Sequence, residues 1–149
     1  MPIGYNRPIN ENDNSWRPDD SIFGGFWEGG KHWSEVIKDD AIEFINDSQN
    51  FQNPFFMYLA FNAPHDPRQA PKKFLNLYPI EKIFIPVNYS PAHPYMYEIG
   101  NGPGLRDEAL APYPRSKYSV KKHIQEYYAI ISHLDEQVGR IISHLENKK

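Results

Sequence analysis

The sequence has no cysteine, no long apolar run and no large excess of one charge. Without cysteine, disulfides and thiol chemistry are excluded, and the redox compartment stays undecided. No apolar run reaches the length of a transmembrane helix, and the first residues lack the apolar core of a signal peptide. The net charge is -3 and the 16 basic residues are scattered, so we expect neither nucleic acid nor membrane as a partner.

Proline and aromatic side chains are abundant instead, in a hydrophilic background. The 149 residues include 14 prolines and 15% aromatic residues, and the mean hydropathy is -0.70. Residues 1–32 show no helical or strand period and alternate asparagine with proline, which is typical of irregular structure. Because Trp16, Phe23 and Trp27 are too apolar for a free tail, we expect this segment to lie over a protein surface.

Residues 33–78 predict a helix, a strand and a second helix. Ser34 suits an N-cap, and the apolar residues that follow it recur at a three-four spacing, which predicts a helix to about Asp47. Phe55–Phe61 is a run of seven apolar or aromatic residues between breakers, which predicts a strand buried on both faces of a parallel sheet. Pro71 suits the first turn of a short helix that Pro79 closes.

The rest of the chain predicts one long loop and one long helix. Residues 79–116 contain seven prolines and three glycines, which predicts a loop with one short strand at Lys82–Ile85. Loops of this length are usually functional or disordered. Residues 117–147 predict an amphipathic helix, whose apolar seam alternates spacings of four and three, as a coiled coil also would. The seam consists of Val120, Ile124, Tyr127, Ile131, Leu134, Val138, Ile141 and Leu145.

These elements do not add up to a complete sheet. A strand that is apolar on both faces needs neighbouring strands, and the sequence offers no second convincing buried strand. We therefore expect an α/β fold of which this chain is an internal piece.

Three motifs, in their order along the chain, carry a resemblance. The unit DDAIEFI is followed by PFFMYLAF (residues 54–61) and, after Asn62, by APHDP (residues 63–67). The last helix contains YYAIISHLDEQVGRIISHLE. Together these motifs resemble the sulfatase family of the alkaline-phosphatase-like superfamily, from about residue 20 to the end. LRDEALAPYPR (residues 105–115) is similar to a bacterial subset of these enzymes. The resemblance implies part of an alkaline-phosphatase-like fold, with one central buried strand, flanking helices and a specificity loop at 79–116.

The resemblance also implies a reaction, the hydrolysis of sulfate esters of a carbohydrate or small molecule. Sulfatases use a formylglycine made from Cys or Ser in a C/S-x-P-x-R motif, together with a divalent metal, usually calcium. His65 falls where the family places a histidine that faces the sulfate and the leaving-group oxygen, and its imidazolium can donate a proton there.

This sequence has neither the C/S-x-P-x-R motif nor the family's metal ligands. We therefore expect formylglycine and calcium to belong to the remainder of the catalytic domain, and the chain alone to show no turnover. The resemblance also implies a periplasmic or extracellular location.

Five more residues are candidates for substrate binding: Asn62, Arg68, Arg106, Asp107 and Glu108. The first two flank His65, and an arginine can bind an anion as a bidentate fork. A hydrogen bond that braces the loop and a surface charge are the alternatives for these two. The other three lie where sulfatase specificity loops carry groups for sugar hydroxyls or carboxylates, and a structural salt-bridge cluster is the alternative for them.

Other chemistry-bearing residues are interpreted as structural or solvated. Lys31-His32 is similar to the family's G-K-W-H motif, but Trp follows His instead of preceding it. Asp19-Asp20 and Asp39-Asp40 imitate the family's metal-binding pair, yet neither follows a buried strand. His133 and His144 share a face of the last helix about 16 Å apart, too far for one metal ion, and a solvated face is expected.

Two other functions stay open. One is a phosphodiesterase or phosphonate hydrolase of the same superfamily. The other is a non-catalytic binding domain that is complete in itself and folds cooperatively alone.

Overall fold

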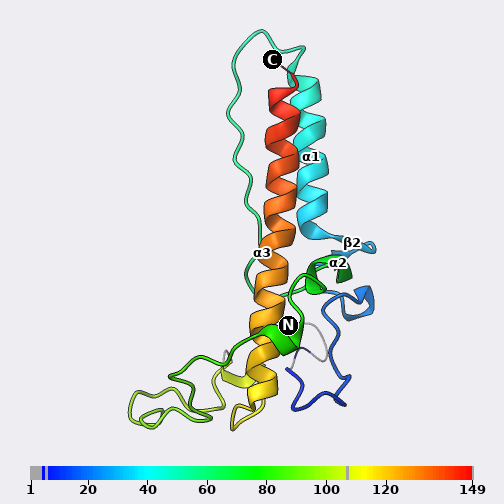
Figure 1. Ribbon diagram of the computed structural model, residues 1–149. Coiled ribbons are helices and arrows are strands. Elements are labelled where there is room, and N and C mark those ends of the chain that lie inside the picture. The colour runs from blue at the N-terminus through cyan, green and yellow to red at the C-terminus, as the bar shows by residue number, and fades with distance from the viewer. Residues whose placement is uncertain (1–4, 6, 107, 149) are drawn as a thin grey trace.

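Two helices, α1 (Trp33–Ser48) and α3 (Lys117–Glu146), lie side by side and form the long axis of the structure (Figure 1). The structure is a computed structural model that describes residues 5, 7–106 and 108–148. A short helix, α2 (Lys72–Leu75), also packs on α3. The N-terminal segment and the long loop gather around the first turns of α3 (Figure 1).

The remaining elements are short. Strands β1 (Trp27–Glu28) and β2 (Lys31–His32) pair antiparallel in a hairpin, with Trp27 opposite His32. Three 3-10 helices add single turns: η1 (Ser21–Phe23), η2 (Ile80–Lys82) and η3 (Glu108–Leu110). None of the helices in the described part of the chain is long and apolar enough to span a membrane.

Helix α1 confirms the predicted helix but not its predicted cap. The N-cap is His32, whose Nδ1 accepts a hydrogen bond from the Ser34 backbone N–H at 3.1 Å. Ser34 is therefore inside the first turn and fully buried, so its assignment as the N-cap was wrong. An imidazole nitrogen can satisfy a free N–H at the start of a helix as a serine oxygen does.

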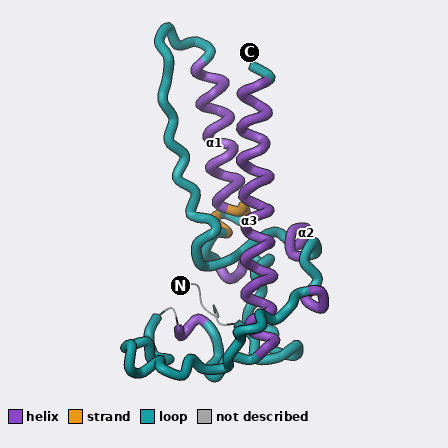
Figure 2. The backbone as a smooth tube through the Cα atoms, turned by 60° about the vertical axis from the view of Figure 1, so that its left-hand side comes forward, coloured by secondary structure: helices purple, strands orange, loops and turns teal. Residues whose placement is uncertain are grey.

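The segment predicted as a central strand is extended but unpaired, which corrects the prediction for Phe55–Phe61. The chain runs as a loop alongside the two long helices (Figure 2). Its side chains alternate as in a strand: Met57, Leu59 and Phe61 pack against α1 and α3, whereas Phe56 is 88% exposed and Tyr58 80% exposed. The described residues supply no neighbouring strand, so this backbone has nothing to pair with.

Two further predictions differ from the structure in the next segment. The second short helix is present, but it is limited to Lys72–Leu75, directly after Pro71. The predicted strand at Lys82–Ile85 is wrong, because Ile80–Lys82 forms a 3-10 turn and the residues after it pair with no described strand.

Helix α3 has the predicted length but buries a different face. Its buried residues are Ser119, Gln125, Glu126, Ala129, Ile130, His133, Gln137 and Ile141. Of the predicted seam only Ile141 is buried, whereas Tyr127, Ile131 and Leu145 are 37% to 44% exposed. The buried face is the one on which α1, α2 and the N-terminal segment pack, and much of it is polar.

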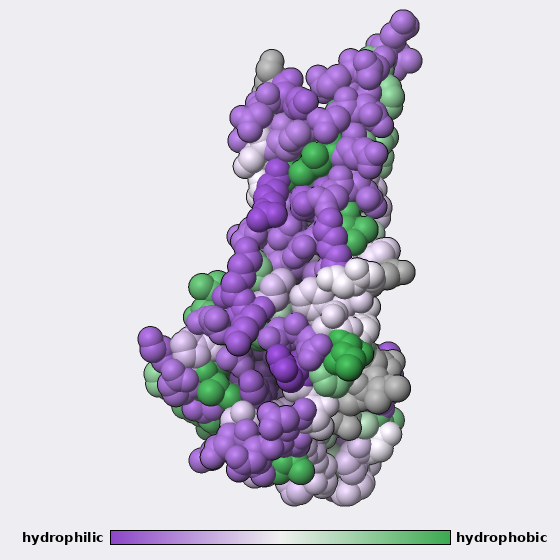
Figure 3. Space-filling view, turned by 90° about the vertical axis from the view of Figure 1, so that its right-hand side faces the viewer, coloured by the Kyte–Doolittle hydropathy of each residue, from purple (hydrophilic) through white to green (hydrophobic). Residues whose placement is uncertain are grey.

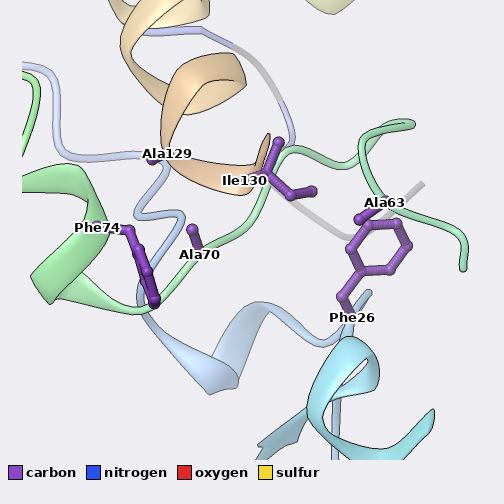
Figure 4. Close-up of a cluster of buried hydrophobic side chains, with 6 residues drawn as sticks. All are labelled: Phe26, Ala63, Ala70, Phe74, Ala129 and Ile130. Carbon is purple, nitrogen blue, oxygen red and sulfur yellow. The ribbon is translucent and has the colours of Figure 1, made fainter. Parts of the chain in front are cut away.

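A small hydrophobic core joins four segments of the chain (Figure 4). It contains Phe26, Ala63, Ala70, Phe74, Ala129 and Ile130, from the N-terminal segment, the loop around His65, α2 and α3. Two smaller clusters lie at Tyr5, Trp16 and Leu110, and at Ala41, Ile45 and Ile141. On the side of the molecule that shows α1, hydrophilic residues dominate and hydrophobic patches are isolated (Figure 3). The described structure is thus mainly helical, with the hairpin as its only paired strands.

Candidate functional site

A hollow of about 540 Å³ brings together three segments that are far apart in the sequence. Its lining consists of Gly25, Phe26, Asn62, His65, Asp66, Pro67 and Arg106. Three of the predicted site residues, Asn62, His65 and Arg106, therefore meet in one place. An imidazole, an amide and a guanidinium at one hollow offer hydrogen-bond donors and positive charge to an anion.

His65 stands exposed in a turn that fixes its ring. The backbone N–H of His65 donates to the Asn62 carbonyl oxygen at 3.0 Å, which closes the turn. The ring Nδ1 lies 3.0 Å from the Asp66 carbonyl oxygen. Because a carbonyl oxygen can only accept, Nδ1 carries the proton, and Nε2 is the nitrogen that can exchange a proton with a ligand.

Asp66 and Arg68 tie this turn to the rest of the structure. Asp66 Oδ1 accepts from the Tyr5 hydroxyl at 2.7 Å and from Arg68 Nη1 at 2.6 Å. Arg68 Nη2 donates to His123 Nδ1 on α3 at 2.8 Å. Arg68 is thus held by Asp66 and His123, and it does not line the hollow.

The candidate Glu108, which follows Arg106 in the long loop, does not line this hollow. Glu108 forms an ion pair with Arg115 at 2.6 Å and accepts a hydrogen bond from Asn101 Nδ2 at 2.8 Å. These three residues line a different hollow, of about 240 Å³. Glu108 therefore has the salt-bridge contacts of the structural alternative, while Asp107 lies outside the described residues.

A family model described as Sulfatase matches residues 3–149. The chain belongs to the sulfatase family. A protein named Sulfatase from Formosa agariphila is 33% identical over 108 residues, which cover 67% of this chain and 20% of that protein. Human iduronate 2-sulfatase is 30% identical over 122 residues, which cover 73% of this chain and 22% of that protein.

An arylsulfatase of Clostridium perfringens is 26% identical over 116 residues, which cover 78% of this chain and 23% of that protein. The chain thus spans about a fifth of the length of the curated relatives it matches. No solved structure matches it.

In this sulfatase chain, Gln69 joins the two walls of the hollow. It is fully buried, and its Oε1 accepts from the Phe26 backbone N–H at 2.7 Å while its Nε2 donates to the Gly24 carbonyl at 2.8 Å. Its own carbonyl accepts from His32 Nε2 at 2.9 Å. Gln69 therefore fixes the Gly24–Phe26 turn against the loop that carries His65. No sequence motif predicts this role.

Two buried histidines stand behind this loop. The rings of His32 and His133 are 4.3 Å apart, nearly at right angles, and His133 Nε2 lies 3.1 Å from Glu35 Oε1. Burial is the main cause that lowers the pKa of each to about 4, so both are neutral at pH 7. The expected solvated face for His133 was wrong, because α1 and α2 cover this part of α3.

A buried ion pair joins the N-terminal segment to α3. Arg7 Nε is 2.7 Å from Glu126 Oε2 on α3, and neither side chain is more than 1% exposed. Burial raises the pKa of Glu126 to about 7, although Arg7 and Arg68 lower it. Nothing in the hydrophobic pattern of either segment signals this pair.

The described residues do not fit a calcium site. Within the described ranges, no group of three or more His, Asp or Glu side chains is placed to hold a metal ion. The acidic pairs are engaged elsewhere: Asp20 caps η1, and Asp39 pairs with Lys31 and Lys38. Asp66, which lines the hollow, has its carboxylate held by Tyr5 and Arg68.

Proposed function

We propose that this chain forms one wall of the active site of a sulfatase that hydrolyses sulfate esters of a carbohydrate. The observation that carries the proposal is the hollow in which Asn62, His65 and Arg106 meet, in a chain that belongs to the sulfatase family. A sugar is favoured as the substrate class because a relative is named for the sulfate of iduronate, a sugar acid.

In this proposal His65 contacts the sulfate and the oxygen of the leaving group. With Nδ1–H held by the Asp66 carbonyl, the imidazolium proton that can be transferred is the one on Nε2. Sulfur would bond to a nucleophile from the remainder of the catalytic domain as its bond to the ester oxygen breaks. Delivery of the His65 proton to that oxygen then yields a neutral alcohol as the leaving group.

Asn62 and Arg106 are proposed as donors to the sulfate or to an acidic sugar group at the same hollow. Arg68 would act on the substrate only indirectly, through its ion pair with Asp66. Asp107 stays a candidate for a sugar hydroxyl, and Glu108 is a weaker one because Arg115 already neutralises it.

The rest of the machinery is proposed to come from the remainder of the catalytic domain. The sequence has no cysteine and no serine in an S-x-P-x-R arrangement, and its described residues do not fit calcium. In the assembled domain, an alkaline-phosphatase-like α/β fold and a periplasmic or extracellular location remain our expectation.

The test is a His65→Asn substitution in the full-length protein that contains this chain. We expect kcat for an aryl sulfate to fall about 100-fold to 10,000-fold, the usual contribution of a general acid. His144→Asn, which changes a histidine near the C-terminal end of α3 and outside the hollow, is the control and should leave kcat unchanged.

Full activity of the His65→Asn protein would exclude the proposed role of His65. A preference for an aryl phosphodiester over the aryl sulfate would instead support the phosphodiesterase function. If the unsubstituted full-length protein turns over neither the aryl sulfate nor the aryl phosphodiester, the non-catalytic function is favoured.

A further inference from the structure

The hydroxyl of Tyr5 is a buried junction of three hydrogen bonds. It donates to Asp66 Oδ1 at 2.7 Å, and it accepts from Arg7 Nη2 at 2.9 Å and from the Arg68 backbone N–H at 3.3 Å. A phenol has one proton and two acceptor sites, so these contacts use its full capacity. Burial raises the pKa of Tyr5 to about 12, and the hydroxyl therefore keeps the proton that it donates.

The ring of Tyr5 is itself held in place. Trp16 packs edge-on against it with ring centres 4.9 Å apart, and the Arg7 guanidinium lies 4.3 Å from the ring centre. Arg7 is in turn paired with Glu126 on α3. The Tyr5 side chain is 4% exposed overall, so its hydroxyl is a fixed point relative to α3.

The partners of this hydroxyl are the residues that immediately follow His65. Tyr5 holds the side chain of Asp66 and the backbone of Arg68, and the backbone carbonyl between them holds Nδ1 of His65. The His65 ring is exposed, so water competes for its two nitrogens unless that carbonyl is kept in position.

We infer that Tyr5 is a positioning residue for His65: its hydroxyl fixes the Asp66–Arg68 turn, whose carbonyl keeps the His65 proton on Nδ1. The catalytic use of this tautomer rests on the proposed function, in which Nε2 of His65 takes up and delivers a proton. The positioning itself does not depend on turnover.

The test replaces Tyr5 by phenylalanine, which keeps the ring against Trp16 and removes only the hydroxyl. In the full-length protein that contains this chain, labelled with ¹⁵N on histidine, the imidazole nitrogen shifts of neutral His65 report the ratio of the Nδ1–H to the Nε2–H tautomer. We expect this ratio to fall about fivefold in Tyr5→Phe, the size expected for the loss of one ordinary hydrogen bond. Tyr97→Phe, at a tyrosine that is 71% exposed, should leave it unchanged.

An unchanged ratio in a folded Tyr5→Phe chain would overturn the inference, as would an equal fall in Tyr97→Phe. If Tyr5→Phe does not fold, Asp66→Asn decides, because it weakens the same hydrogen bond from its other end and should lower the ratio too. Since the measurement needs no turnover, it stands apart from the test of sulfate hydrolysis, which can fail while the tautomer result holds.

Discussion

The histidines of this chain differ in burial, and their chemistry differs accordingly. His65 is exposed at the hollow, whereas His32, His123 and His133 are enclosed by other elements. His32 has a defined neutral form, because its Nδ1 accepts from the Ser34 N–H and its Nε2 donates to the Gln69 carbonyl. A proton added to this ring would break the cap of α1. The buried histidines thus act in the structure as neutral hydrogen-bonding groups.

This burial predicts that the folded chain loses stability as the pH falls from 6.5 to 5. Burial is the largest cause that lowers the pKa of His32 and His133 to about 4, and that of His123 to about 2, below the ordinary 6.5. In this window the unfolded chain binds the histidine protons and the folded chain does not. Glu126 opposes the trend, because its pKa is raised to about 7 and the folded chain binds its proton. Three histidines against one carboxyl leave a net uptake on unfolding that grows from about one proton near pH 6.5 to about two near pH 5.

Urea denaturation at several pH values measures this effect. The free energy of unfolding should fall with a slope that steepens from about 1 kcal/mol per pH unit near pH 6.5 to about 3 near pH 5, as the linkage slope follows the number of protons taken up. The control is Glu126→Gln, which removes the opposing group and should make the fall steeper, although it also lowers stability at neutral pH. A flat profile between pH 6.5 and 5 would contradict the burial of these histidines.

At the scale of elements, the positions of the helices could be predicted better than the faces that they bury. The three-four spacing of apolar residues predicted both long helices, to within two residues at their ends. The buried face of α3 could not be read from this spacing, because Glu126 is buried by its pairing with Arg7 and His133 by its contact with Glu35. Such partners are 98 or more residues away in sequence, and hydrophobic periodicity does not report them.

The candidate site could be predicted only in part. His65 and Asn62 were proposed from a local motif and Arg106 from its place in a glycine-rich loop, and the structure brings these three residues to one hollow. The residues that hold the site, Tyr5 and Gln69, have no local signature. Each acts through a single hydrogen-bonding group on a backbone that is brought near only by folding.

Two isoleucines of α3 test which face is buried. Ile130 is fully buried in the core with Phe74 and Ala129, whereas Ile142 is 51% exposed on the same helix. Ile130→Ala should lower the free energy of unfolding by about 2–5 kcal/mol, through lost burial and the cavity left behind. Ile142→Ala is the matched control and should change it by less than about 0.5 kcal/mol, as at most surface sites. Equal losses would show that the described face of α3 is not the buried one.

At the scale of the whole molecule, residues 54–61 show a structure that is only half enclosed. Met57, Leu59 and Phe61 pack on α1 and α3, while Phe56 and Tyr58 on the opposite face are exposed. An extended backbone with unpaired N–H and C=O groups and large exposed aromatics is a template for pairing with another strand. In the proposed sulfatase, neighbouring strands of the catalytic domain would cover it.

For the chain by itself, this geometry predicts self-association through residues 54–61. Phe56→Lys places a charge on the exposed face, where it meets no packed neighbour, and should reduce association in sedimentation experiments without lowering the melting temperature. Met57→Lys is the matched control, because the adjacent side chain faces the cluster of Ala41, Ile45 and Ile141. Burying an unpaired charge there should lower the melting temperature strongly.

If both substitutions unfold the chain equally, the two faces of the segment are not distinct. If Phe56→Lys leaves association unchanged, the contact between copies lies on a different surface.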